Sequence, residues 1–88
     1  MNDYSIQYAP RVRDDIARLP RKIQIRIDQA ILSLAGNPRP HGVVKLAGQD
    51  DLYRIRVGDY RIIYAIRDRH CIIIIATVAH RREVYRDF

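Results

Sequence analysis

A two-residue turn signal at Gly58-Asp59 constrains the fold of this 88-residue chain more than any other feature. Apolar and polar residues alternate over residues 53–57 and again over residues 60–66, which is the pattern of two half-buried strands. A glycine followed by an aspartate between two such runs is typical of a tight β-hairpin. Because the turn fixes the register, it also assigns every side chain of the hairpin to one of two faces.

One face of the predicted hairpin is cationic and the other is apolar. The register places Arg56 directly opposite Arg61, with Arg54 on the same face. The apolar face is formed by Tyr53, Ile55, Val57, Tyr60, Ile62 and Tyr64. Like charges that face each other across two strands destabilise a sheet by a few tenths to about 1 kcal/mol, so folding alone does not favour this pair of arginines. The cationic face therefore predicts a site for an anion.

The composition agrees with an acidic partner. The chain has 16 Lys and Arg against 10 Asp and Glu and a formal net charge of +6, so nucleic acid, an anionic protein or a membrane surface would suit it. Its single cysteine, Cys71, excludes an intrachain disulfide and fits a reducing cytoplasm. The N-terminal residues do not resemble a secretion leader, and no apolar run reaches the length of a membrane span, about 18 residues. We therefore expect a single domain over residues 1–88 and no membrane partner.

An opening strand and a short helix are predicted at the start of the chain. Residues 4–8 alternate between apolar and polar and predict the strand. Val12, Ile16 and Leu19 then recur at intervals of four and three, which predicts an amphipathic helix. Pro20 ends this helix because proline cannot continue its hydrogen bonds.

A second helix is predicted from Arg21 to about Leu34, and Gly36 with the prolines after it marks the exit. Its apolar stripe consists of Ile23, Ile27, Ala30, Ile31 and Leu34. Residues 43–46 suit a brief strand, and residues 71–79 are apolar on both alternations, which is typical of a central strand. We therefore expect an α+β fold, in which the first strand and a two-helix hairpin pack on one face of a mainly antiparallel, twisted sheet of about four strands.

The three hairpin arginines have the chemistry of a phosphate site. Guanidinium groups bind phosphate through paired N–H donors and stay charged at any physiological pH. A single arginine in such a strand is more readily explained as an ordinary solvent-facing residue, but three on one face, two of them directly opposed, favour a binding site. Because arginine is a poor proton acceptor, a general base must come from elsewhere in the chain.

The segment after the last predicted strand supplies candidates for that base. His80 is a candidate proton acceptor, followed by Arg81, Arg82 and Tyr85. If the turn at Asp68-Arg69 pairs Arg67 with His70, alternation puts His80 on the face of Arg61. A loop with an odd number of residues, or a bulge, would put Arg81 there instead. Tyr85 suits either packing on a short C-terminal helical segment or stacking on a base.

No metal or other cofactor is expected. The remaining histidines, His41 in a loop and His70 in a turn, show no ligand spacing with each other or with Cys71, so a zinc site is not predicted. Phosphate-cradling glycine motifs are also absent from the sequence.

Three segments of the chain, taken together, resemble the RelE/ParE superfamily of toxin-antitoxin toxins, on its RelE side. They are residues 45–48 (KLAG), 52–64 (LYRIRVGDYRIIY) and 80–85 (HRREVY). The resemblance implies a RelE-like fold and a ribosome-dependent, metal-independent endoribonuclease that cuts mRNA codons in the A site. The 2′-hydroxyl would attack the adjacent phosphate, leaving a cyclic phosphate and a 5′-hydroxyl. The implied partners are mRNA, the ribosome with its 16S rRNA, and a RelB-like antitoxin.

The resemblance also assigns roles to individual residues. Arg61 matches the arginine that contacts the scissile phosphate, Arg81 the second catalytic arginine, and Tyr85 the tyrosine that stacks on the nucleotide. Arg54 and Arg56 stand where well-studied members carry two lysines, one of which has been implicated as the base. Arginine cannot take over that role, although it can stabilise negative charge.

The resulting hypothesis divides the site between charge stabilisation and proton transfer. Arg54, Arg56, Arg61 and Arg81 meet the charge of the transition state, and His80 transfers the proton. The residues expected to contact RNA outside the catalytic set are Lys45, Arg54, Arg56 and Arg82. Two alternatives stay open at this point, a ParE-like inhibitor of DNA gyrase and a catalytically inactive module that binds nucleic acid or protein.

Overall fold

A computed structural model describes residues 3–48 and 51–81 of the chain. The elements follow the order β1 (Ser5–Tyr8), α1 (Val12–Ala17), α2 (Arg21–Gly36), β2 (Val44–Lys45), β3 (Leu52–Val57), β4 (Tyr60–Arg67), the 3₁₀ turn η1 (Asp68–His70) and β5 (Ile72–His80). Within these described residues, no helix is long and apolar enough to span a lipid bilayer. The expected C-terminal helical segment lies outside the described residues.

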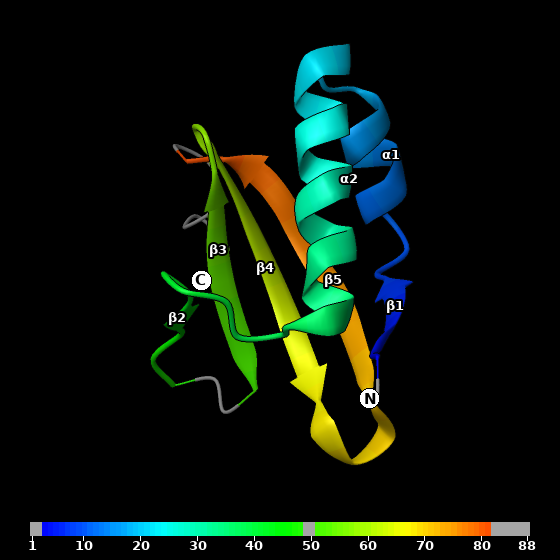
Figure 1. Cartoon of the computed structure of the whole chain (residues 1–88). Coiled ribbons are helices and arrows are strands. Elements are labelled where there is room, and N and C mark those ends of the chain that lie inside the picture. Colours follow the sequence, from blue (N-terminus) through cyan, green and yellow to red (C-terminus); the bar gives the residue numbers. More distant parts are fainter. Residues whose placement is uncertain (1–2, 49–50, 82–88) are drawn as a thin grey trace.

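The strands form one mixed sheet in the order β1-β5-β4-β3-β2. β1 runs parallel to β5, and the other neighbours are antiparallel. Both helices lie on the same face of the sheet, as Figure 1 shows. The predicted α+β architecture is therefore confirmed, with five strands instead of about four because the brief Val44–Lys45 segment does pair with β3.

The apolar stripe of α2 packs onto the apolar face of the hairpin. Ile27, Ile31 and Leu34 are fully buried in this helix, and Ile55 and Ile62 lie in the same core cluster. Each such side chain contributes roughly 1.5–3 kcal/mol when it leaves water. The helix layer therefore holds one face of the sheet, and the arginines must lie on the other.

The hairpin turn has the geometry that its glycine predicts. Gly58 has a φ of 59° and Asp59 has no positive φ, which corresponds to a type II′ turn. This turn pairs Val57 with Tyr60, so the register expected from the sequence is confirmed.

A β-bulge interrupts the pairing of β4 with β5. Tyr64 pairs with Ile75 and Ile63 pairs with Thr77, so Ala76 is an extra residue without a partner on β4. An extra residue shifts the alternation by one, and side chains beyond it change faces. The bulge therefore decides which residues at the end of β5 lie beside the hairpin arginines.

Candidate functional site

Arg54, Arg56 and Arg61 share the sheet face that lies opposite the helices. Arg56 pairs directly with Arg61, and Arg54 pairs with Ile63 one step further along. Because the pair that closes the turn is hydrogen-bonded, the Arg56/Arg61 pair is of the non-hydrogen-bonded type, with Cα atoms about 4.5 Å apart. Two guanidinium stems therefore leave the sheet side by side. We call these three residues the arginine face.

Arg61 is a buried cation. Its exposed fraction is 8%, and its Nη1 donates to the carbonyl oxygen of Tyr60 over 3.3 Å. Its Nε is buried and has no hydrogen-bond partner among the described residues. Burying a charge is costly unless an opposite charge or several hydrogen bonds compensate it. An anionic ligand would supply that compensation.

Two other arginines of the chain have the carboxylate partner that Arg61 lacks. Arg39 pairs with Asp68 at 2.8 Å, and Arg67 pairs with Asp51. Within residues 3–48 and 51–81, no carboxylate forms an ion pair with Arg61. The charge of Arg61 is therefore not neutralised by any carboxylate of the described residues.

Arg81 is fixed beside the hairpin turn. Its backbone N–H donates to the carbonyl oxygen of Asp59 over 2.8 Å. Arg61 pairs with Ala79 across β4 and β5, and one further step of alternation puts Arg81 on the face of Arg61. The structure thus brings Arg81 to the arginine face.

His80 lies on the other face of the sheet. It pairs with Tyr60, and the two rings are in edge contact with their centroids 5.4 Å apart. Tyr60 packs against the core cluster under the helices. Of the two arrangements that the sequence left open, the structure has the second. The bulge at Ala76 shifts the alternation, so Arg81 and not His80 lies on the face of Arg61.

The structure does not bring Lys45 to the arginine face. Lys45 is exposed on β2 and pairs with Tyr53, so its side chain shares the face of Tyr53 and not that of Arg54. Arg82 and Tyr85 lie outside the described residues. Their roles stay predictions.

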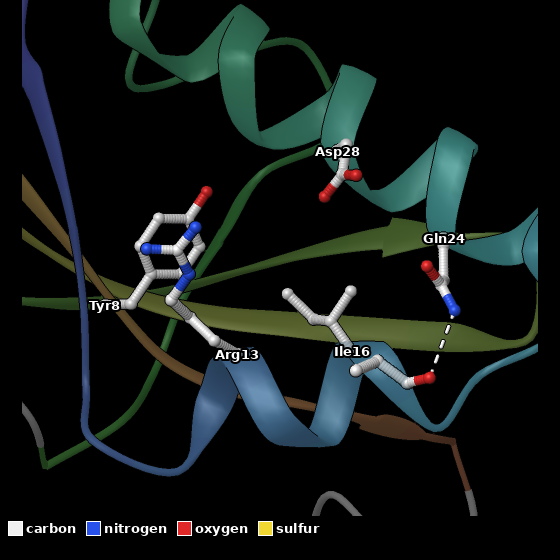
Figure 2. A pocket seen from close by; sticks show the side chains of 6 residues that line it. Tyr8, Arg13, Ile16, Gln24 and Asp28 are labelled. Carbon is white, nitrogen blue, oxygen red and sulfur yellow. Dashed lines mark hydrogen bonds between the residues drawn. The ribbon is translucent and has the colours of Figure 1, made fainter.

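A pocket of about 190 Å³ lies on the helix side of the sheet, between β1, α1 and α2. Figure 2 shows the guanidinium of Arg13 over the ring of Tyr8, 5.3 Å from its centroid, with Asp28 on the far wall. Burial, together with the carboxylate of Asp28, raises the pKa of Tyr8. Gln24 donates to the carbonyl oxygen of Ala17 over 3.1 Å and joins the two helices. This pocket combines one cation with one anion, so it does not suit a polyanion.

His41 has no functional signal in the sequence. It lines a groove together with Arg56, although the two residues are 15 positions apart in the sequence. No spacing or motif indicates this proximity, because it arises from the path of the loop between α2 and β2. Among the described residues, no group of three His, Cys, Asp or Glu side chains gathers as in a metal site.

The chain matches the sequence model of a family described as the ParE toxin of the type II toxin-antitoxin system parDE, over residues 6–85. This match covers most of the chain and defines its class, the toxins of type II toxin-antitoxin systems. The toxin RelE of Mycobacterium tuberculosis is 32% identical over 84 residues, which are 94% of this chain and 87% of that protein.

Solved structures of similar proteins agree with this class. The toxin fold of the archaeal RelE-RelB complex from Pyrococcus horikoshii has a TM-score of 0.82 and 30% identity, over 93% of this chain and 99% of that chain. The RelB-RelE complex from Methanococcus jannaschii gives a TM-score of 0.75 and 28% identity, over 93% of this chain and 98% of that chain. The chain belongs to the RelE/ParE family of type II toxins and is RelE-like, which confirms the resemblance seen in the sequence.

Proposed function

We propose that this RelE-like toxin is a ribosome-dependent endoribonuclease that cleaves mRNA codons in the A site and thereby inhibits translation in the cytoplasm. The observation that carries the proposal is the buried cation of Arg61, which has no carboxylate partner among the described residues and lies opposite Arg56. A site that accepts both a desolvated charge and a like-charge neighbour is suited to a ligand with negative charge.

The proposed reaction needs electrostatic stabilisation more than any other contribution. When the 2′-hydroxyl attacks the neighbouring phosphate, negative charge grows on the phosphate oxygens. Arg61 and Arg56 on the hairpin, with Arg81 beside the turn, provide preorganised donors for that charge. Removing one such group from an enzyme typically costs about 10² to 10³ in rate.

The family roles of the C-terminal residues complete the proposal. Tyr85 would stack on the nucleotide and orient it, and Arg82 would contact the RNA backbone. Lys45, on the far face of β2, is better placed to contact RNA or rRNA that passes the sheet edge than the scissile phosphate itself.

We further propose that a RelB-like antitoxin silences the toxin. Two solved relatives are complexes of RelE with RelB. The arginine face offers such a partner a cationic surface, to which an acidic segment would be attracted. An antitoxin that covers Arg61 would compensate its buried charge in the same way as RNA.

A reconstituted translation reaction with one defined message tests the proposal. We expect the wild-type protein to cut the message at codons in the A site, and only when ribosomes are present. Arg61→Ala should lower the cleavage rate by about 10² to 10³. Arg69→Ala, which removes an exposed arginine of η1 at the opposite end of the sheet, is the matched control and should leave the rate unchanged.

Two other outcomes would contradict the proposal. Inhibition of gyrase supercoiling without cleavage of the message would instead indicate ParE-like activity. Binding to RNA or protein with neither activity would indicate an inactive module.

A further inference from the structure

We infer that His41 is a catalytic residue that takes the proton from the attacking 2′-hydroxyl of the RNA. This inference rests on the proposed ribonuclease function and extends it. The arginine face can stabilise charge but cannot accept a proton, and His80 lies on the opposite face. Of the three histidines, His41 is the one that lines a groove together with a residue of the arginine face, Arg56.

His41 lines a groove beside Ile55 and Arg56 of β3, next to the two positions of β3 that pair with β2. The groove has a volume of about 340 Å³ and is lined by Pro40, His41, Gly42, Ile55 and Arg56. Of these residues, only His41 and Arg56 carry a titratable or charged side chain. Arg56 is also the partner of Arg61 across the hairpin, so one residue belongs both to the groove and to the proposed phosphate site.

A tight turn presents His41 at its tip. The backbone N–H of Val43 donates to the carbonyl oxygen of Pro40 over 3.0 Å, and Gly42 has a φ of 90°. These are the features of a type II turn with His41 and Gly42 at its two central positions. The first central position projects from the chain, and His41 is accordingly exposed.

The loop that carries this turn is fixed at its base. The hydroxyl of Tyr64, a fully buried residue of β4, donates to the carbonyl oxygen of Pro38 over 2.6 Å. Burial raises the pKa of Tyr64 to about 12, so the hydroxyl keeps its proton at neutral pH. In Figure 1 this loop, drawn in green, leaves the end of α2 and crosses the sheet to β2.

A second anchor lies one residue further on. Arg39 donates two hydrogen bonds to the carboxylate of Asp68, at 2.8 and 3.3 Å, and its guanidinium lies 5.1 Å from the ring centroid of Tyr53. The hydroxyl of Tyr4 donates to the same carboxylate over 2.7 Å. With both anchors the turn is a positioned element rather than a free loop, which a proton acceptor requires.

The proposed step needs only the RNA, His41 and water. The 2′-oxygen forms a bond to phosphorus, and its proton moves to a ring nitrogen of His41. The bond from phosphorus to the 5′-oxygen breaks, and this oxygen takes a proton from water. The imidazolium then returns its proton to solvent, which leaves a 2′,3′-cyclic phosphate and a 5′-hydroxyl.

Single-turnover cleavage of a message on purified ribosomes tests the role of His41. We expect His41→Gln to slow cleavage by about 10² to 10⁴, the usual contribution of acid-base catalysis, while binding to the ribosome is unchanged. The pH profile of the cleavage rate should also differ between the wild type and His41→Gln, because the substitution removes a proton acceptor. Added imidazole should partly restore cleavage by His41→Ala, an effect that a purely structural role would not produce.

His70→Gln, an exposed histidine of η1 at the other end of the sheet, is the matched control and should behave as the wild type. Cleavage by His41→Gln at the wild-type rate and with the wild-type pH profile would overturn the inference while leaving the ribonuclease proposal intact. Absence of cleavage by the wild type would remove both.

Discussion

The backbone N–H of Arg81 donates to the carbonyl oxygen of Asp59, which joins the end of β5 to the tip of the β3-β4 hairpin. This bond and the bulge at Ala76 together determine where the side chains at the end of β5 lie. The bulge moves His80 to the core side, next to Tyr60, and leaves Arg81 on the side of Arg61. A single extra residue in β5 thus determines which of two neighbouring basic side chains joins the site.

The first prediction separates these two neighbours. Arg81→Ala should abolish growth arrest when the toxin is induced, because it removes the cation that lies beside the arginine face. His80→Gln should have a much smaller effect, because the side chain lies on the opposite face. Colony counts after induction and cleavage of a translated message both measure the difference. A loss of about 10² or more in cleavage with His80→Gln would restore the role that the sequence suggested.

The second prediction concerns the cost of the arginine face to stability. Arg61→Met should raise the free energy of unfolding by about 1 kcal/mol, because it removes a like-charge pair and a buried N–H group without a partner. Urea denaturation measures the change. Arg67→Met is the control and should give no such increase, since Arg67 pairs with Asp51. A clear decrease with Arg61→Met would show that Arg61 stabilises the fold instead.

The third prediction concerns the hairpin turn. Gly58→Ala should lower the free energy of unfolding by about 1–3 kcal/mol, because alanine is strained at a φ of 59°. A Cβ there would also lie 3.2 Å from the guanidinium of Arg26. Gly36→Ala, at the end of α2 with open space around it, should instead raise stability by about 0.4–1 kcal/mol. Equal effects of the two substitutions would contradict the type II′ turn.

The fourth prediction concerns the anchor of the His41 loop. Hydrogen bonds from Arg39 and Tyr4 lower the pKa of Asp68 from its ordinary value of 3.8 to about 2. Because the folded-state pKa is depressed, the stability from this carboxylate is fully present above about pH 4 and is lost as the pH falls toward 2. Asp68→Asn should therefore melt at a lower temperature than the wild type at pH 6, and the gap should close between pH 4 and 2.

Arg39→Gln should show the same pH dependence, because it removes the other side of the same ion pair. A difference in melting temperature that stays constant from pH 6 to pH 2 would exclude the carboxylate as its origin.

Local patterns were sufficient to predict the hairpin and the two helices. The alternation around Gly58-Asp59 gave the observed pairing of Arg56 with Arg61. The periodicity of the second helix gave the buried positions of α2, of which Ile27 and Ile31 are fully buried. Helices and hairpins depend on residues that are close together in the sequence. The side-chain period of about 3.6 residues in a helix and 2 in a strand therefore relates them directly to the sequence pattern.

The sequence by itself determined an α+β fold with a cationic hairpin face and membership of a toxin family. Only the tertiary structure decided that Arg81 and not His80 lies on that face, that Lys45 does not, and that His41 lines a groove with Arg56. The physical reason is that side chains alternate between the two faces of a sheet along each strand. One extra residue in a bulge therefore moves every side chain after it to the opposite face. The position of a loop depends likewise on distant anchors, here Tyr64 and Asp68, that no local pattern reveals.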